Sequence, residues 1–266
     1  MCTLTWLREG EGYELFFNRD ELSTRLPARA PERRTSRGVE FLAPIDADAG
    51  GTWLAVNAFG VAVGIMNGEL RSVPPAESTS RGLLVLALAD SGSVGEIARR
   101  LGETELSPLR GFSLFALEPE EKLLLARWDG LALALAREDD SVQPLSSSSR
   151  DPRGAELARK ALFAQLFARE RPTRALLEAF HASHEPGRGA LSPCMHRDDA
   201  ATVSFTRVKV DRRAVELGSS SGPPCRGGRL ATLRLPRKLL ARAARAAHGE
   251  QVPGSRPGAA RGSDPP

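Results

Sequence analysis

Residues 1–22 read MCTLTWLREGEGYELFFNRDEL, and this stretch predicts the first element of the fold. The runs at 2–7 and 13–18 are rich in Thr, Leu, Phe, Tyr and Trp, residue types that favour strands. Between them lies REGEG, whose glycines are typical of a turn. Two strand-forming runs joined by a short glycine-containing turn predict a β-hairpin at the start of the chain.

The hairpin would bring the tetrapeptide Asn18-Arg19-Asp20-Glu21 back to Cys2. With the turn centred near position 10, position 2 faces position 18. A shift of one residue in the register still leaves Asn18, Arg19 and Asp20 beside Cys2. Local pairing alone therefore predicts that a cation and a carboxylate lie next to a thiol.

This juxtaposition has a chemical interpretation. Removal of Met1 would give Cys2 a free α-amine, and an N-terminal amine can act as the base for its own thiol. Arg19 would favour the thiolate, and Asp20 would orient the amine. The structural alternative is a small buried strand residue, Cys2, beside a local Arg19–Asp20 ion pair, and the hairpin itself does not decide between the two.

The rest of the chain continues the strand pattern and then changes to helices. The polar stretch 23–38 is interpreted as a surface loop. Strands are expected within 41–67, two helical pieces within 81–101, three strands within 111–136, helices within 155–170 and 173–183, and a last hairpin within 200–218. Strands, then helices, then strands predict an α+β sandwich of sheets with the helices outside.

Composition limits the classes of protein. The chain has 266 residues with 41% hydrophobic residues, which suits one globular domain, expected over 1–248. The tail 249–266 is rich in Pro, Gly and Ser and is expected to be disordered. No apolar run is long enough to cross a membrane and no secretory signal opens the chain, so we expect no integral membrane association.

Three scattered cysteines do not form a disulfide framework, and a cytoplasmic location is expected. The net charge of +4 comes mostly from arginines spread along the chain. An even spread of charge does not form a nucleic-acid surface, so no nucleic-acid partner is predicted. The composition resembles that of proteins from GC-rich, bacterial genomes.

A second group of reactive residues lies in SPCMHRDDAATVS, with Cys194 and His196 followed by Asp198 and Asp199. A Cys-x-His pair is half of a metal site, but sequence spacing shows no matching second pair, because Cys225, His181 and His184 are too far away to be counted. We therefore predict no metal and no cofactor. A Cys194–His196 catalytic dyad is an alternative.

Four stretches together resemble one family. MCTLTW, FFNRDE, GGTWLAVNAFGVAVGIMN and SRGLLV, in this order, are similar to the NRDE family, also called the transport and Golgi organization 2 family. The resemblance implies a four-layer αββα sandwich of the N-terminal nucleophile hydrolase type. It also implies that Cys2 is the nucleophile, that Arg19 lies near the thiol and that Asp20 lies near the amine.

The resemblance extends to further positions. Asn67 stands where the family carries an Asn after GGTW and would stabilise an oxyanion; a turn-forming Asn before Gly68 is the alternative. Many members read LSN where this chain has Ser147, a shorter replacement. Asn18, Ser147 and His196 are expected to contact substrate.

The resulting functional prediction is hydrolysis of a carbon–nitrogen (amide) bond in a small molecule. The alternative is a non-catalytic binding or trafficking protein of the transport and Golgi organization type that carries a small hydrophobic ligand, haem or lipid. Ser147 favours the carrier, and the intact set Cys2, Arg19 and Asp20 favours the enzyme.

Overall fold

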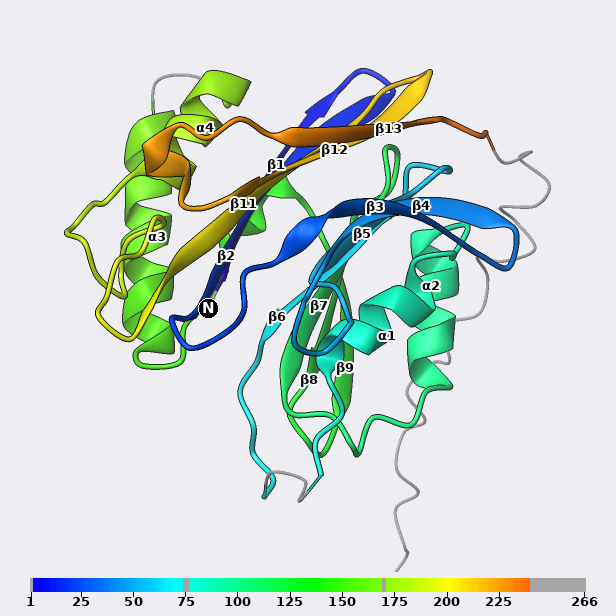
Figure 1. Cartoon of the computed structure of the whole chain (residues 1–266), viewed down its shortest axis with the longest axis horizontal. Coiled ribbons are helices and arrows are strands. Elements are labelled where there is room, and N and C mark those ends of the chain that lie inside the picture. Colours follow the sequence, from blue (N-terminus) through cyan, green and yellow to red (C-terminus); the bar gives the residue numbers. More distant parts are fainter. Residues whose placement is uncertain (1, 74–76, 169–170, 240–266) are drawn as a thin grey trace, which may run out of the picture.

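The computed structural model describes residues 2–73, 77–168 and 171–239, which form two antiparallel sheets covered by helices (Figure 1). The first sheet has six strands in the order β10-β1-β2-β11-β12-β13. Their bounds are β1 Cys2–Glu9, β2 Gly12–Leu22, β10 Leu145–Ser147, β11 Ala200–Val210, β12 Ala214–Ser221 and β13 Ala231–Pro236. The first and last parts of the chain are thus neighbours in one sheet.

The second sheet has seven strands in the sequential order β3-β4-β5-β6-β7-β8-β9. Their bounds are β3 Arg29–Ser36, β4 Val39–Ile45, β5 Leu54–Asn57, β6 Ala62–Asn67, β7 Phe112–Leu117, β8 Leu123–Trp128 and β9 Leu133–Glu138. Every neighbouring pair is antiparallel, so short turns connect most of these strands.

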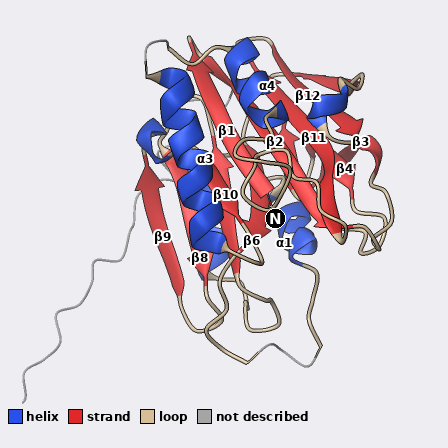
Figure 2. Ribbon diagram, turned by 90° about the vertical axis from the view of Figure 1, so that its left-hand side faces the viewer, coloured by secondary structure: helices blue, strands red, loops and turns tan. Residues whose placement is uncertain are grey.

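Helices cover the outer faces of both sheets (Figure 1), and Figure 2 views the molecule from the side of the helices that cover the first sheet. The helices α1 Arg81–Leu88 and α2 Val94–Gly102 pack on the second sheet, whereas α3 Pro152–Phe167 and α4 Arg174–Ala182 pack on the first. The largest apolar cluster, which includes Leu4, Trp6, Phe17 and Phe115, fills the space between the sheets. The order helix, sheet, sheet, helix confirms the predicted αββα sandwich.

The predicted helices and hairpins are present with small shifts at their ends. Ser93 caps α2, since its hydroxyl accepts a hydrogen bond from the Glu96 amide, and the chain breaks between α1 and α2 as expected. The first hairpin pairs Cys2 with Arg19, one residue from the centred register. The three runs in 111–136 are β7, β8 and the start of β9.

The prediction of a surface loop over 23–38 was wrong for residues 29–36, which form β3. This strand lies at the edge of the second sheet and none of its residues is buried, so it has no apolar face to reveal it in sequence. Charged residues on an edge strand oppose edge-to-edge aggregation. The short strand β10 and the late strand β13 were also not anticipated.

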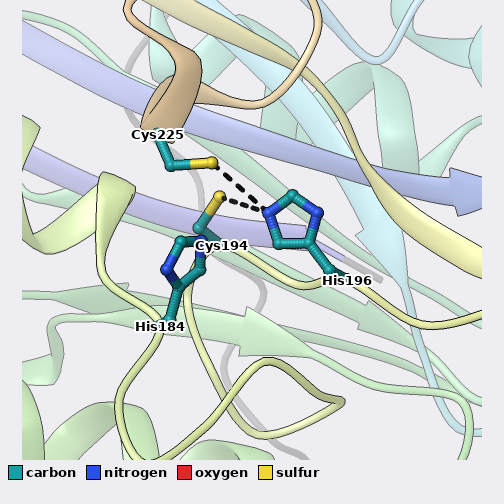
Figure 3. Close-up of side chains that lie close together, drawn as sticks. All are labelled: His184, Cys194, His196 and Cys225. Atoms are coloured by element: carbon teal, nitrogen blue, oxygen red, sulfur yellow. Dashed lines mark hydrogen bonds between the residues drawn. The ribbon is translucent and has the colours of Figure 1, made fainter.

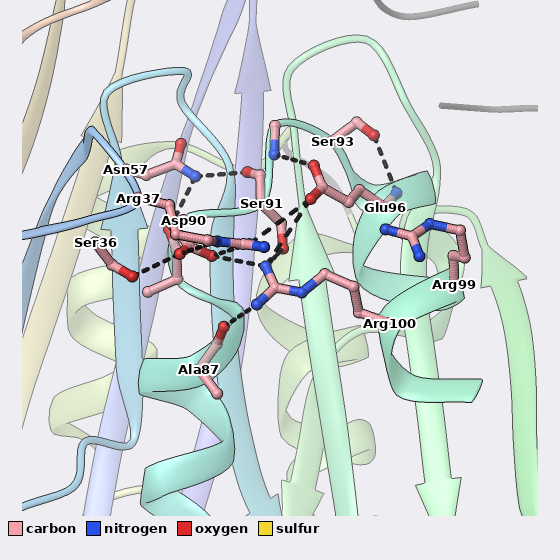
Figure 4. Close-up of polar contacts among 12 residues, drawn as sticks. Ser36, Arg37, Asn57, Ala87, Asp90, Ser91, Ser93, Glu96, Arg99 and Arg100 are labelled. Carbon is pink, nitrogen blue, oxygen red and sulfur yellow. Dashed lines mark hydrogen bonds and ion pairs between the residues drawn. The ribbon is translucent and has the colours of Figure 1, made fainter. Parts of the chain in front are cut away.

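A polar network holds the β3–β4 turn to the helices of the second sheet (Figure 4). The buried carboxylate of Asp90 accepts hydrogen bonds from Ser36, Arg37 and Arg100. Burial opposes ionisation of Asp90, but these hydrogen bonds outweigh it and lower its pKa. Asn57 adds bonds to the carbonyls of Ala89 and Ser91.

Within the described residues, no helix combines the length and apolar character needed to cross a membrane. The tail 249–266, for which disorder was expected, lies outside the described residues.

Candidate functional site

Cys2 lies between two strands whose facing residues are those that the sequence singled out. In the β1–β2 pair its partner is Arg19, and in the β1–β10 pair its partner is Ser147. Asp20 follows Arg19 on β2. The prediction that the hairpin places Arg19 and Asp20 beside Cys2 is confirmed. The position of Ser147 on the other side follows from pairing between segments that are far apart in sequence, which local rules do not predict.

The thiol of Cys2 is almost completely buried, with 7% of the residue exposed. Burial raises the pKa of the thiol, and the Asp20 backbone amide and the Arg19 guanidinium offset this effect only in part. Cys2 is therefore a neutral thiol at pH 7, and a nucleophilic role requires a base that removes its proton.

Arg19 is buried and held from several sides. Its guanidinium carbon lies 4.5 Å from the centre of the Trp53 ring, a cation–π contact. Its Nη2 lies 3.2 Å from Glu21 and 4.0 Å from Asp46. These contacts fix the guanidinium beside Cys2 in one orientation.

Asp20 is buried against the helix layer. Its Oδ1 accepts a 2.6 Å hydrogen bond from Thr202, and its Oδ2 lies 3.7 Å from the guanidinium of Arg159. Burial raises the pKa of Asp20, and Arg159 and Thr202 act in the opposite direction. Thr202 in turn exchanges hydrogen bonds with Met195, which ties Asp20 to the loop before β11.

Arg159 is a site residue that the sequence analysis missed. It lies in the middle of α3, is completely buried, and donates from Nη1 to the main-chain carbonyl of Cys2 at 3.2 Å. Its other nitrogens donate to the carbonyls of Ala190 and Leu191. The buried positions of α3 are Ala155 and Arg159. Because the buried face of a helix is normally apolar, an arginine on this face was the feature of the sequence that could have identified Arg159.

A cavity of about 280 Å³ opens at Cys2. Cys2, Arg19 and Asp20 line it, and so does Asn67 at the end of β6. The predicted catalytic residues Cys2, Arg19, Asp20 and Asn67 thus share one cavity. Asn67 is exposed, in contrast to the buried residues around the thiol.

The lining of this cavity also contains two further arginines, Arg81 at the start of α1 and Arg110, which together are called the basic wall. Arg81 donates to the Gly111 carbonyl, and burial lowers its pKa. The α1 start reaches the cavity because Gly51 packs on the Gly82 backbone, where a Cβ at position 51 would lie 2.6 Å from the Gly82 carbonyl carbon.

The three residues expected to contact substrate lie in different environments. Asn18 points away from the cavity, and its Nδ2 donates to the carbonyls of His181 and Pro193. Ser147 is buried opposite Cys2, and its Oγ has no hydrogen-bond partner among the described residues. His196 lines a second cavity of about 350 Å³ that shares Arg19 with the first. Substrate contact by these residues stays a prediction.

Four possible metal ligands meet beside the second cavity (Figure 3). The donor atoms of His184, Cys194, His196 and Cys225 all lie within 4.8 Å of one another. The prediction of no metal rested on the lack of a second pair in sequence spacing. Tertiary structure supplies that pair, because His184 and Cys225 come from segments that are distant from Cys194 in sequence.

The chain is similar to known proteins in sequence and in fold. The sequence profile of the family described as Transport and Golgi organisation 2 matches residues 1–153. No protein among the curated sequences matches the chain.

Several solved structures share the fold. Penicillin V acylase from Agrobacterium tumefaciens is 13% identical, covers 84% of each chain and has a TM-score of 0.50. A variant of conjugated bile acid hydrolase from Clostridium perfringens is 12% identical with a TM-score of 0.54, and the match covers 90% of this chain and 99% of that one. A Caenorhabditis elegans orthologue of N-acylethanolamine-hydrolyzing acid amidase is 11% identical with a TM-score of 0.52, covering 78% and 92%. The fold is therefore that of N-terminal nucleophile hydrolases.

Proposed function

Because the chain belongs to the Transport and Golgi organisation 2 family and has the fold of N-terminal nucleophile hydrolases, we propose that it hydrolyses an amide bond of a small molecule. One observation carries the proposal. Cys2 pairs in register with Arg19 and Ser147, and Cys2, Arg19 and the next residue, Asp20, line one cavity. The amidase activities in the names of the similar structures support the same reaction class.

The proposed reaction begins with removal of the chain ahead of Cys2, which frees its α-amine. This amine accepts the thiol proton, since an α-amine has a pKa of about 7.7–8.0, and Asp20 holds the resulting ammonium. Arg19 stabilises the thiolate during the transfer. Burial keeps the Cys2 thiol neutral, so a base must remove its proton, and the α-amine of the same residue supplies that base.

In the next steps, the Cys2 sulfur attacks the amide carbonyl carbon and forms a tetrahedral oxyanion. The Asn67 side-chain amide and the Ser147 hydroxyl are the proposed oxyanion donors. The carbon–nitrogen bond then breaks, and the leaving amine takes the proton from the Cys2 ammonium. Water, deprotonated by the freed Cys2 amine, hydrolyses the thioester and releases the acid and the free thiol.

The basic wall indicates the charge of the substrate. Arg25 at the cavity is paired with Asp46, and Arg19 is paired with Glu21. For Arg81 and Arg110, by contrast, the described residues provide hydrogen bonds to a carbonyl and a hydroxyl but no carboxylate. We therefore propose an amide that carries a carboxylate or another anionic group.

The test is turnover of N-acyl amino acids beside their methyl esters, with release of the free amine as the readout. We expect hydrolysis that prefers the free acids, an acyl adduct on Cys2 in intact mass spectra, and loss of both with Cys2→Ala. Arg81→Gln should raise KM for the acids and leave KM for the esters unchanged. Turnover that survives Cys2→Ala would refute Cys2 as the nucleophile.

The alternative is a carrier of a small hydrophobic ligand, haem or lipid. The second cavity favours it, because Leu22, Leu26, Pro27 and Ala28 form part of its wall. Titration with haem and with a fluorescent fatty acid tests this function. Saturable binding that Cys2→Ala leaves unchanged, in protein without amidase turnover, would favour the carrier over the enzyme.

A further inference from the structure

We propose that His184, Cys194, His196 and Cys225 bind one Zn²⁺ ion in a tetrahedral site. Three separate segments bring these residues together. His184 follows α4, Cys194 and His196 lie in the loop before β11, and Cys225 lies in a single helical turn, Pro224–Arg226, after β12. The Cys194 amide donates to the Ser183 carbonyl, which aligns the first two segments.

The distances fit a tetrahedral zinc ion. The Nε2 atom of His196 lies 3.5 Å from the sulfur of Cys194 and 3.4 Å from the sulfur of Cys225. Zinc bonds of about 2.3 Å to sulfur and about 2.0 Å to nitrogen, at the tetrahedral angle, separate these ligand atoms by about 3.5 Å. Both sulfur–nitrogen distances therefore match those of such a site.

His184 provides the fourth corner. Its ring centre lies 5.0 Å from that of His196, and its donor atom is within 4.8 Å of the other three. The Nε2 of His184 is buried and has no hydrogen-bond partner among the described residues. A buried ring nitrogen without a partner costs free energy, and a metal ion would satisfy it. Two thiolates and two imidazoles are a donor set that zinc prefers.

The burial of Cys194 argues against a catalytic dyad with His196. Cys194 is completely buried and lines neither cavity, so a substrate cannot reach its sulfur without a rearrangement. In addition, His196 Nε2 contacts both sulfurs about equally, whereas a dyad needs one nucleophile. Four protein ligands leave no open position for substrate, which is typical of a structural zinc site.

The location gives this zinc ion a structural role at the candidate active site. Between the ligands Cys194 and His196 lies Met195, which exchanges hydrogen bonds with Thr202, and Thr202 donates to Asp20. The preceding Pro193 carbonyl accepts from Asn18. Zinc would fix the segment 193–196, and this segment supports Asn18 and Asp20 from behind.

The first test is the metal content of the full chain, expressed with zinc supplied and purified with a reductant. We expect one zinc per chain by mass spectrometry of the metal, and Cys194→Ser and Cys225→Ser should each weaken zinc binding by about tenfold or more. The control is Cys2→Ser, a thiol outside the cluster, which should keep its zinc. Cobalt in place of zinc should show the visible absorption of a tetrahedral ion and a thiolate charge-transfer band.

Thiol protection keeps the proposal testable if the variants fail to fold. In the wild-type chain, Cys194 and Cys225 should be protected from iodoacetamide with zinc and become reactive after a chelator is added, and Cys2 should not change in the same way. Reduced, folded protein that binds no zinc, or that shows no zinc-dependent protection, would overturn the proposal. A Cys194–Cys225 disulfide as the resting state, or a different metal bound in preference to zinc, would also overturn it.

Discussion

Arg159 donates a hydrogen bond from Nη1 to the main-chain carbonyl of Cys2 at 3.2 Å, across 157 positions of the chain. The same guanidinium lies 3.7 Å from Asp20, and both side chains are completely buried. One arginine on α3 therefore connects the proposed nucleophile and the carboxylate that would hold its amine.

Replacement of Arg159 by Met should lower the free energy of unfolding by roughly 3–5 kcal/mol, because it leaves the Asp20 carboxylate buried without its cation. Chemical denaturation measures this effect. The matched control is Lys160→Met on the same helix, which removes an exposed ion pair with Glu156 and should cost less than about 0.5 kcal/mol. Equal effects of the two variants would contradict the role assigned to Arg159.

The reactivity of Cys2 should depend on Arg19. Burial raises the pKa of the Cys2 thiol and Arg19 lowers it, so removal of Arg19 should raise it further. Below this pKa, the rate of alkylation follows the small thiolate fraction and increases about tenfold per pH unit.

Arg19→Ala should therefore slow alkylation of Cys2 at pH 7.5, and Arg19→Lys should retain part of the wild-type rate, since the charge remains. Peptide mapping after brief treatment with iodoacetamide reports Cys2, Cys194 and Cys225 separately. A Cys2 rate that is the same in all three proteins would show that Arg19 does not act on the sulfur.

Replacement of Ser147 by Ala should separate an effect on catalysis from an effect on stability. Its Oγ makes no hydrogen bond with the described residues, so Ser147→Ala should leave the thermal midpoint nearly unchanged. If the hydroxyl stabilises the oxyanion, the same variant should lower kcat by up to about a hundredfold at a similar KM. A drop in stability without a change in kcat would assign Ser147 to packing.

His181 should make the fold sensitive to mild acid. Burial lowers the pKa of His181 to about 3, and Arg159 acts in the same direction. The unfolded chain has a histidine pKa of about 6.5, so the stabilising contribution is complete above this pH and declines as the pH falls below it.

By pH 5 the loss should reach about 2 kcal/mol. Denaturation curves at several pH values measure it, and His181→Gln should flatten the slope between pH 6.5 and 5. His181→Gln keeps a donor for Thr5, whose Oγ1 lies 2.9 Å from His181 Nε2. A wild-type slope in the variant would show that another group titrates.

Asp90 should make the stability of the fold depend on pH in a lower range than His181 does. Hydrogen bonds from Arg37, Ser36 and Arg100 outweigh burial and lower the pKa of Asp90, so its contribution is present above about pH 4 and lost below it. Asp90→Asn should cost roughly 2–3 kcal/mol at pH 7, because Arg37 and Arg100 lose their nearer charged partner and keep only the more distant Glu96. Glu103→Gln, in an exposed pair with Arg99, is the control and should change little.

Local pairing is enough to predict the first hairpin and the residues that it brings together. The hairpin of β1 and β2 closes over a two-residue turn, so Arg19 and Asp20 had to lie near Cys2. The alternation of strand runs and amphipathic helices likewise predicted sheets with helices outside. Hydrophobic periodicity predicts these elements because each has one buried face and one solvent-facing face, so apolar and polar residues recur at regular intervals. Strand β3 has no buried face, and its sequence was therefore interpreted as a loop.

The residues that join the site from distant parts of the chain depend on long-range packing. Ser147 faces Cys2 because β10 pairs with β1, and Arg159 reaches both Cys2 and Asp20 because α3 packs on the first sheet. The cluster of His184, Cys194, His196 and Cys225 likewise depends on how the end of α4, the start of β11 and the end of β12 come together. These contacts join segments that are far apart in sequence, and packing of the layers, rather than any local spacing, sets their distances.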